Sequence, residues 1–350
     1  MSARFDFVAV KQLTRDTFRQ SYASGICGIL LAVTAICVVL CLSVSVSGDV
    51  SLHGGDEPAL FLPSSLPSGV ASKMLGSPDH GSAPETDPAM ARREGFETVG
   101  GRMTLAFGAV SFPISRERRD AVVFLELLLA GGIAGTLGLL LSLVWTAGFL
   151  PSFLEPAAAS VLLAKPVERW QLLIGKYGSV LSFMGMQVAL FVVLTWLSLG
   201  MRTAVWDTTY LWCIPLILIQ FAVFYSFSVL LAVFTRSTVA CVFGSVLFWL
   251  LSWGINYGSV MAYSLPESQA FPATTLALAD AAYWGTPKPI DTALILFNAL
   301  DAQHHFEKPQ VFKTLESRRS FSPAMSILSS LLLAGVLLGL SVHEFNLTDY

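Results

Sequence analysis

The sequence predicts an all-α polytopic membrane protein with about six transmembrane helices. Of its 350 residues, 54% are hydrophobic and only 13% are charged, and the mean hydropathy is +0.66. This composition is far from that of a soluble globular domain. The chain contains about six apolar runs, each near the ~20 residues that a helix needs to cross a hydrocarbon core of roughly 30 Å. Because the runs do not alternate between apolar and polar residues, a transmembrane barrel is disfavoured.

The predicted spans share an apolar composition and an almost complete lack of charge. They are residues 24–47, 121–150, 177–199, 210–234, 239–263 and 324–342. The segments between and after them are an external loop at 48–120, a cytoplasmic segment at 151–176, an external loop at 264–323 and a cytoplasmic tail at 343–350. Helices are expected because a helix satisfies its own backbone donors and acceptors in lipid.

Residues 1–23 are expected to form an amphipathic interfacial helix on the cytoplasmic side. Apolar residues such as Phe7 and Phe18 are mixed with basic residues such as Lys11 and Arg15, which is typical of helices that lie on a membrane surface. A disordered basic tail is the alternative. The apolar stretch that follows exceeds the 7–15 residues of a signal-peptide core, so we expect an uncleaved anchor.

The distribution of Lys and Arg indicates that both termini are cytoplasmic. Basic residues are concentrated in the N-terminal segment, in residues 151–176 and at Arg236 after the fourth span, and short cytoplasmic loops carry such an excess. Basic clusters at 116–119 and 318–319 fall on the opposite side, but they belong to longer loops, which count less. We therefore expect a multi-pass protein of the cell (inner, cytoplasmic) membrane.

The two long loops are expected to contain small external elements. Residues 53–88 are rich in Gly, Ser, Pro and Asp, which is typical of a mobile loop. A strand-like run at 103–112 indicates a short β segment, with a hairpin that turns at Gly108. In the second loop, residues 290–300 are expected to form a short helix packed on the outer face.

The sequence shows no catalytic or cofactor-binding constellation. Gly175-Lys176 resembles the end of a phosphate-binding loop, but Trp170 stands where that motif needs Gly and Tyr177 where it needs Ser or Thr. The zinc motif HExxH and the nucleophile motif GxSxG do not occur. The five cysteines lie in or beside apolar spans without metal-ligand spacing. We expect no enzyme activity, no cofactor, no metal site and no nucleic-acid partner.

His304 and His305, near Asp301 and Glu307, allow two interpretations. An external metal site is one. Adjacent histidines usually cannot face one ion from a regular element, so a solvated loop is preferred.

The second predicted span contains Glu126, the single acid within the spans, and a glycine pair, Gly131 and Gly135. Glu126 lies about six residues, or roughly 9 Å, along the helix from Asp120. At that depth snorkelling, a bridge to an external Arg and a contact with substrate all remain open. The GxxxG pair is typical of close helix packing, within the monomer or across a dimer. The amides Gln187, Gln220 and Asn256 are expected to bridge helices.

Residues 151–176 are the most informative segment of the chain. Pro156 can begin a short helix, and Pro166 can begin a second helix that continues into the third span. Charged side chains are interleaved with an apolar surface. We expect a rigid elbow at the membrane interface on which a soluble partner docks. A membrane-anchoring loop with ordinary basic residues is the alternative. The residues expected to couple to the partner are Glu155, Lys165, Pro166, Glu168, Arg169, Trp170 and Lys176.

At these residues the chain resembles the membrane subunits of ABC-2 type exporters, particularly the permease branch associated with multicopper enzyme maturation. The pattern consists of the acid Glu155, alanines at 157–159, the run LLAKPVER at 162–169, and Gly175-Lys176 before a span. The order of spans and loops is also similar. Members of this branch often have Gly-Thr after the acid and a basic tail residue, whereas this chain has alanines and no tail Lys or Arg.

The resemblance implies an ATP-driven exporter with two permease subunits, either a homodimer or a pair of permeases. Two separate cytoplasmic ABC ATPase subunits would drive it through the elbow and the N-terminal helix. A non-transporting membrane scaffold or assembly protein is the alternative. A membrane-embedded enzyme is disfavoured because no set of polar residues converges at one depth.

Overall fold

The computed structural model describes residues 7–23, 25–47, 101–114, 118–154, 168–264, 271–317 and 322–347. The first half of the chain forms α1 (Phe7–Ala23), α2 (Ile26–Leu42), β1 (Ser45–Ser47), β2 (Gly101–Leu105), η1 (Ala106–Gly108), β3 (Val110–Ile114), α5 (Arg118–Leu127), η2 (Leu128–Gly138), α6 (Leu139–Thr146) and α7 (Phe149–Phe153). The second half forms α9 (Arg169–Thr203), η3 (Thr208–Trp212), α10 (Cys213–Thr235), α11 (Thr238–Ser264), α12 (Ala273–Trp284), α13 (Pro289–Ala299), η5 (Ala302–His304), α14 (Gln310–Ser317) and α15 (Pro323–Leu347).

The fold is that of an all-α polytopic membrane protein, as predicted. Within the described residues, five helical stretches are long and apolar enough to cross a membrane: Arg119–Phe153, Arg169–Thr203, Thr208–Thr235, Thr238–Tyr263 and Pro323–Leu347. The first predicted span is shorter than expected, because α2 has 17 residues. It counts as a sixth span only together with α1, from which it is bent by 70°.

Two helices extend beyond the apolar runs that predicted them. The helix expected at 177–199 already begins at Arg169, after the extended residue Glu168. The helix expected at 324–342 continues to Leu347, through residues expected to form a tail. The flanking residues 343–347 contain no proline or glycine that would end a helix. Residues 169–176 contain no proline, and their one glycine, Gly175, is accommodated within the helix.

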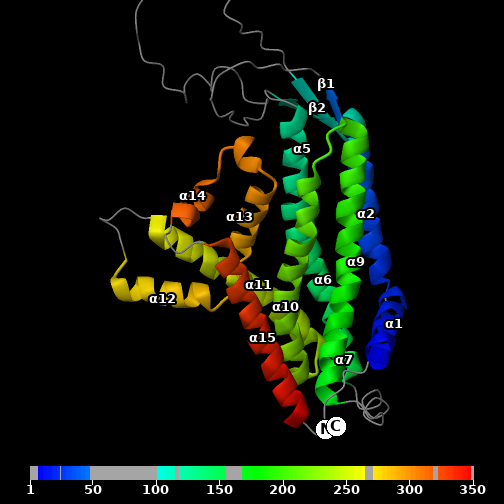
Figure 1. The fold of residues 1–350 in the computed structure, drawn as a ribbon, viewed down its shortest axis with the longest axis vertical. Coiled ribbons are helices and arrows are strands. Elements are labelled where there is room, and N and C mark those ends of the chain that lie inside the picture. The colour runs from blue at the N-terminus through cyan, green and yellow to red at the C-terminus, as the bar shows by residue number, and fades with distance from the viewer. Residues whose placement is uncertain are drawn as a thin grey trace, which may run out of the picture.

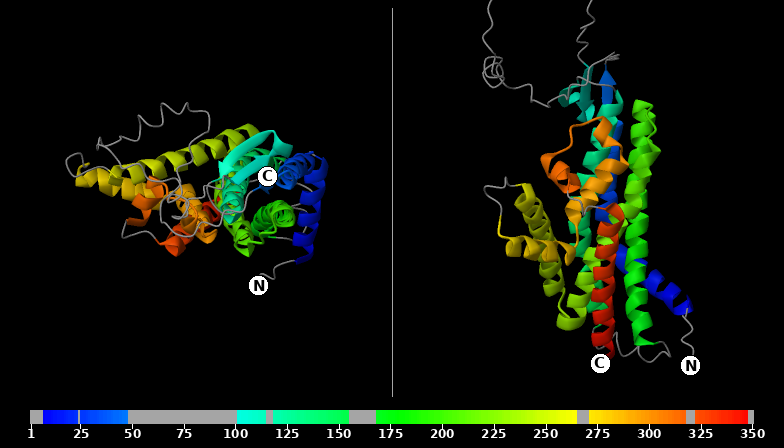
Figure 2. Two further views of the ribbon diagram at one scale, coloured as in Figure 1. Left: turned by 90° about the horizontal axis from the view of Figure 1, so that it is seen from above. Right: turned by 60° about the vertical axis from the view of Figure 1, so that its left-hand side comes forward.

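The long helix α9 organises the bundle. It contacts α1, α2, α10 and α15, and α10 in turn contacts α11 and α15. The three-stranded sheet lies at one end of the bundle, while α1 and the C-terminal end of α15 lie at the other (Figure 1). Figure 2 shows α11 and α12 extending to one side, opposite α1 and α2.

The interior contains two main apolar clusters stacked along the bundle. The cluster nearer α1 and α7 is rich in aromatic rings, with Tyr225 stacked between Tyr177 at 5.7 Å and Phe221 at 5.4 Å. The cluster nearer the sheet includes Tyr210 and Leu199. All five cysteines are buried and have free thiols, as expected for packing residues. These clusters fix α9 against α10 along most of its length.

The predicted hairpin is confirmed. Strands β2 and β3 pair antiparallel, and the turn passes through Phe107 and Gly108, whose φ angles are 57° and 94°. The sequence did not predict β1, which pairs with β2 so that Ser45 faces Thr104. The mobile loop expected at 53–88 lies outside the described residues.

The helix expected at 290–300 is confirmed as α13, which begins with Pro289. It is less peripheral than expected, because it packs against α10, α11 and α15, and Ile290 and Leu294 are buried. Two further helices, α12 and α14, flank it on one side of the bundle (Figure 1).

The glycine-rich stretch 128–138 is π-helical rather than α-helical. The hydroxyl of Thr136 donates to the carbonyl of Gly131, five residues earlier, at 3.0 Å. A Cβ placed on Gly135 would lie 2.8 Å from the carbonyl oxygen of Ala130, also five residues earlier. The missing side chain of Gly135 therefore leaves room for the carbonyl of Ala130 in the wide π-helical turn. No other element lies within 4 Å of the added Cβ in the described structure. Gly131 does adjoin another helix, since its added Cβ would lie 3.5 Å from Leu296 of α13.

We expect Gly135→Ala to destabilise the protein by about 1–3 kcal/mol, because the new methyl group would overlap a backbone carbonyl. Thermal unfolding in detergent should show a lower midpoint. Gly335→Ala on α15 is the matched control, since nothing lies within 4 Å of its added Cβ, and it should be neutral or stabilising by up to about 1 kcal/mol. Equal midpoints for the two variants would contradict the steric role of Gly135.

Candidate functional site

Lys176 joins α9 to α1 and α7. Its ammonium donates to Thr17 Oγ1 at 3.1 Å and to Gln20 Oε1 at 3.0 Å, both on α1. The Gln20 amide then donates to Ser152 Oγ on α7 at 3.0 Å. One chain of hydrogen bonds therefore links three helices at the end of the bundle opposite the sheet. We call the set Lys176, Thr17, Gln20 and Ser152 the basal junction.

The surroundings of Lys176 allow a cation to be buried there. The side chain is 4% exposed, and its nitrogen lies 5.7 Å from the ring centroid of Phe149 and 5.9 Å from that of Phe153. Aromatic faces at such distances attract a cation, and the carboxylate of Asp16 on α1 adds further attraction. Lys176 was expected among the side chains that face a soluble partner. That expectation is corrected, because the side chain is directed into the protein against α1.

Of the other residues predicted to couple to a partner, three can be located in the structure and three cannot. Glu155, Lys165 and Pro166 lie outside the described residues. Glu168 is exposed just before α9 and accepts a hydrogen bond from the indole of Trp170, while Arg169 and Trp170 are half-buried in the first turn. The beginning of α9 therefore presents polar side chains beside the basal junction.

Sequence reasoning missed the partners of Lys176 on α1. Thr14, Thr17 and Ser21 recur at helical spacing, and Thr17 and Ser21 are fully buried. The Thr14 hydroxyl meets that of Ser179 on α9 at 3.1 Å. A stripe of small hydroxyl residues within an amphipathic helix was the available signal, because such residues let another helix approach closely.

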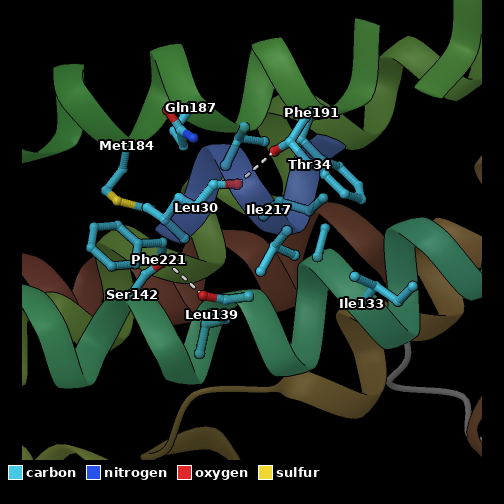
Figure 3. Close-up of a pocket in the computed structure, with 14 residues that line it drawn as sticks. Leu30, Thr34, Ile133, Leu139, Ser142, Met184, Gln187, Phe191, Ile217 and Phe221 are labelled. Atoms are coloured by element: carbon cyan, nitrogen blue, oxygen red, sulfur yellow. Dashed lines mark hydrogen bonds between the residues drawn. The ribbon is translucent and has the colours of Figure 1, made fainter. Parts of the chain in front are cut away.

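A second feature is an apolar pocket of about 60 Å³ between α2, the π-helical segment with α6, α9 and α10 (Figure 3). Leu30, Ile133, Leu139 and Phe221 are among its lining residues, and none of the lining residues is charged. Gln187 of α9 also lines it and is 4% exposed. Neither polar atom of the Gln187 amide has a hydrogen-bond partner among the described residues.

The three span amides behave differently from one another. Asn256 links α11 to the loop between α12 and α13, because its amide nitrogen donates to the carbonyls of Ser252 in its own helix and of Pro287 in that loop. Gln187 forms no such bridge in the described structure. Gln220 lines a smaller pocket on the other side of α10. Gln187 thus leaves both polar atoms without a partner among the described residues, whereas Asn256 leaves only its Oδ1 in that state.

Glu126 is more deeply buried than a snorkelling residue would be. Its side chain is 1% exposed, and Oε2 has no hydrogen-bond partner in the described part of the chain. The carboxyl feels repulsion from Asp207 and attraction from Arg119, but no salt bridge joins it to a base among the described residues. The structure therefore does not show the bridge to an external Arg. Glu126 is also not among the residues that line the pocket.

Lys288 is the centre of a second buried polar cluster. Its nitrogen lies 4.4 Å from the ring centroid of Trp284 and 5.0 Å from that of Tyr283, and it donates to Ser329 of α15. The nearby carboxylate of Asp291 accepts a 2.5 Å hydrogen bond from Tyr283. This cluster ties α12, α13 and α15 together. Burial lowers the pKa of Lys288 to about 8, although the charge of Asp291 acts to raise it.

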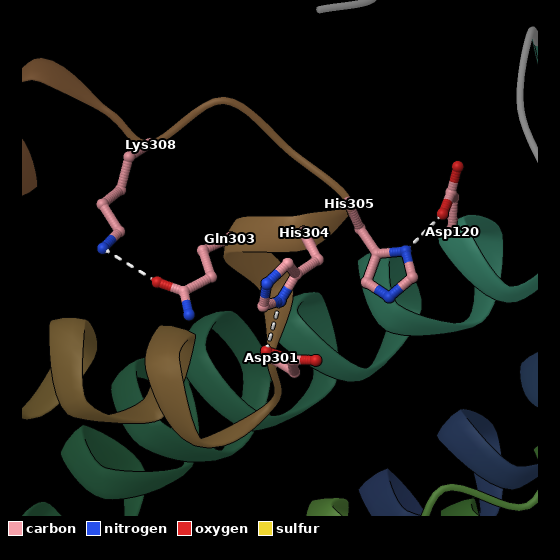
Figure 4. A network of polar contacts seen from close by, with 6 residues as sticks. All are labelled: Asp120, Asp301, Gln303, His304, His305 and Lys308. Atoms are coloured by element: carbon pink, nitrogen blue, oxygen red, sulfur yellow. Dashed lines mark hydrogen bonds and ion pairs between the residues drawn. The ribbon is translucent and has the colours of Figure 1, made fainter. Parts of the chain in front are cut away.

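His304 and His305 do not converge on one point (Figure 4). The Nδ1 atom of His304 lies 2.6 Å from Asp301, whereas that of His305 pairs with Asp120 at the start of α5. His304 is exposed and His305 is largely buried. No group of three or more potential ligands in the described ranges is placed to hold a metal ion. The pair with Asp120 instead attaches the loop after α13 to α5.

Comparisons with protein-family models, with curated proteins and with solved structures find no match to this chain. Its function must therefore be inferred from its own sequence and geometry.

Replacing Lys176 by Met should loosen α1 from α9. The substitution keeps the length of the side chain but leaves Thr17 and Gln20 without their donor, at a cost of about 1–3 kcal/mol. A Thr14→Cys/Ser179→Cys pair reports the contact, because the native hydroxyl oxygens are 3.1 Å apart. We expect rapid oxidative cross-linking with Lys176 present and slower cross-linking in the Lys176→Met background. Lys313→Met on α14, whose side chain pairs with Glu307 outside the basal junction, is the control. Equal rates in all backgrounds would contradict the role of the basal junction.

Stability should rise with pH through the titration of Lys288. A lysine titrates near 10.4 in an unfolded chain, and the pKa of folded Lys288 is about 8. Between roughly pH 8 and pH 10 the unfolded state therefore binds more protons, so the free energy of unfolding increases as pH rises. Unfolding midpoints recorded over this interval should rise less in Lys288→Met than in the wild type. Lys313→Met should retain the wild-type slope, and an unchanged slope in Lys288→Met would refute the assignment.

Proposed function

We propose that this chain is the membrane permease subunit of an ABC-2 type ATP-driven exporter, which works with a separate cytoplasmic ATPase. The observation that carries the proposal is the basal junction, in which a buried lysine locks an amphipathic helix onto the base of a long membrane-spanning helix. A partner that pushes on α1 acts on a helix that lies directly against α9. The basal junction is therefore a rigid site at one end of the bundle through which a partner subunit could move α9.

The helices that receive the force also surround the pocket. Helix α9 has 35 residues, which corresponds to roughly 50 Å at 1.5 Å per residue. Helix α2 follows α1 after the 70° bend. Both α2 and α9 line the pocket of Figure 3. A displacement of α1 relative to α9 would therefore alter the pocket, which is the geometric requirement for coupling ATP hydrolysis to transport.

The proposal requires that the basal junction faces the cytoplasm. Arg15 and Arg19 on α1, Arg169 at the start of α9 and Arg236 after α10 supply the basic residues that favour this side. In this orientation the sheet lies outside, on the opposite side of the membrane. A functional unit would contain two copies of the chain, or this chain with a second permease, and two ATPases.

Charge reversal at Lys165 and Arg169 should abolish stimulation of the partner ATPase while leaving membrane insertion intact. The two side chains are basic residues of the proposed docking surface, and reversing them would replace attraction to the partner by repulsion. The measurement is ATP hydrolysis by the co-expressed ATPase, reconstituted in liposomes with wild-type or Lys165→Glu/Arg169→Glu permease.

The matched control is Lys308→Glu/Lys313→Glu, which reverses two charges outside the basal region and should preserve stimulation. Normal stimulation with the Lys165→Glu/Arg169→Glu variant would count against coupling through this segment. A scaffold that does not transport would give no stimulated hydrolysis even with the wild-type chain.

A further inference from the structure

We propose that the pocket around Gln187 binds an amphiphile that carries an uncharged hydroxyl or amide group on an apolar chain. This inference deepens the proposed function, because the occupant would belong to the class of molecules transported. Binding itself requires no ATPase, so the two proposals can fail separately.

The chemistry of the bound group follows from the unused amide. Gln187 offers two N–H donors and one carbonyl acceptor, and neither polar atom has a partner in the described structure. The other two polar residues of the pocket already donate to their own helices, Thr34 to Leu30 O at 2.9 Å and Ser142 to Gly138 O at 2.6 Å (Figure 3). A ligand group that both donates and accepts would satisfy Gln187. Hydroxyl and amide groups have this property.

The lining excludes a charged group. No lysine, arginine, aspartate, glutamate or histidine contributes to the pocket, and an ion without a counter-charge is costly in such surroundings. Gln187 lies 18 residues into the 35-residue α9, or about 27 Å from its start. The amide is thus near the middle of the span, where hydration of a charge is least available.

The size of the pocket indicates that only part of the ligand enters it. The cavity of about 60 Å³ is less than half the size of a ~150 Å³ protein cavity that admits benzene. A terminal hydroxymethyl or carboxamide group has this bulk, but a complete amphiphile does not. Val33, Ile133 and Ala134 line the pocket and are only partly buried, so an apolar chain can leave between α2 and the π-helical segment.

The π-helical segment supports the same conclusion independently. Ile133, Ala134 and Gly138 of this segment line the pocket, and π-helical turns frequently occur at functional sites. The π-helical segment thus forms part of the wall of the pocket to which Gln187 of α9 also contributes. Met184, another lining residue, has a flexible side chain that can adapt to different apolar chains.

Photolabelling tests the inference with a diazirine derivative of octanol and the full-length protein in lipid nanodiscs without ATPase. We expect mass spectrometry to locate the label on residues of α2, η2 and α9 that line the pocket. Octanol and octanamide should compete with the label, whereas octane and octanoate should compete at least tenfold less well. Equal competition by octane or octanoate would overturn the assigned chemistry.

Gln187→Leu should reduce labelling of the pocket about tenfold, because it removes the hydrogen-bonding group while keeping an apolar side chain of similar size. Gln220→Leu is the matched control, since this amide lies in the other pocket, and it should label like the wild type. Ala134→Leu should also abolish labelling, because the larger side chain fills the pocket while the Gln187 amide is kept.

Unchanged labelling in both Gln187→Leu and Ala134→Leu would overturn the site. A site occupied by water alone would give no competable labelling in the wild type, and that result would also overturn the proposal. Competable labelling together with normal ATPase stimulation by the Lys165→Glu/Arg169→Glu variant would retain the binding site and reject the coupling route.

Discussion

Burial of the Lys176 ammonium is the constraint on which the base of the structure depends. Removing a charge from water costs several kcal/mol unless nearby groups replace its hydration. Thr17 and Gln20 of α1 supply the hydrogen bonds, and the rings of Phe149 and Phe153 supply further attraction. Helix α1 therefore cannot leave α9 without depriving the ammonium of its partners. Because Gln20 also holds Ser152 of α7, one cation determines how three helices meet beside the segment proposed to receive force.

Most other buried polar groups in the described bundle are satisfied locally, which makes the exceptions informative. The hydroxyls of Thr34, Ser142 and Thr195 donate to carbonyls of their own helices, a common arrangement in membrane helices. Such bonds require nothing from neighbouring helices and leave them free to shift. Gln187 and Glu126 have unbonded polar atoms in the described structure, as do other buried residues such as Tyr225 and Ser245. Gln187 differs from these because both of its polar atoms are unbonded and the residue lines the pocket.

The spans were predictable because about 20 apolar residues in a row have few stable structures other than a membrane helix. Their exact ends were not, because the residues from Arg169 to Lys176, which include Gly175 and two basic side chains, are helical although they lie outside the apolar run. Burial of Lys176 was missed because basic residues beside a span usually face water, and only the fold brings α1 against it. Strand β1 was missed because its partner Thr104 lies 59 residues from Ser45. The π-turn at Gly135 was not predictable, because the spacing of the glycines alone cannot distinguish a helix contact from a π-turn.

The pocket and the basal junction are related through packing. Close-packed interiors resist small displacements, because helices that interdigitate must separate before they can slide. Around Gln187 the helices α2, α6, α9 and α10 and the π-helical segment leave a space of about 60 Å³, so side chains there can move without first displacing a neighbour. A rotation of α1 and α2 against α9 would therefore be accommodated first at the pocket. An occupant bonded to Gln187 would bias this movement, since a ligand shifts a conformational equilibrium only by as much as its affinities for the two states differ.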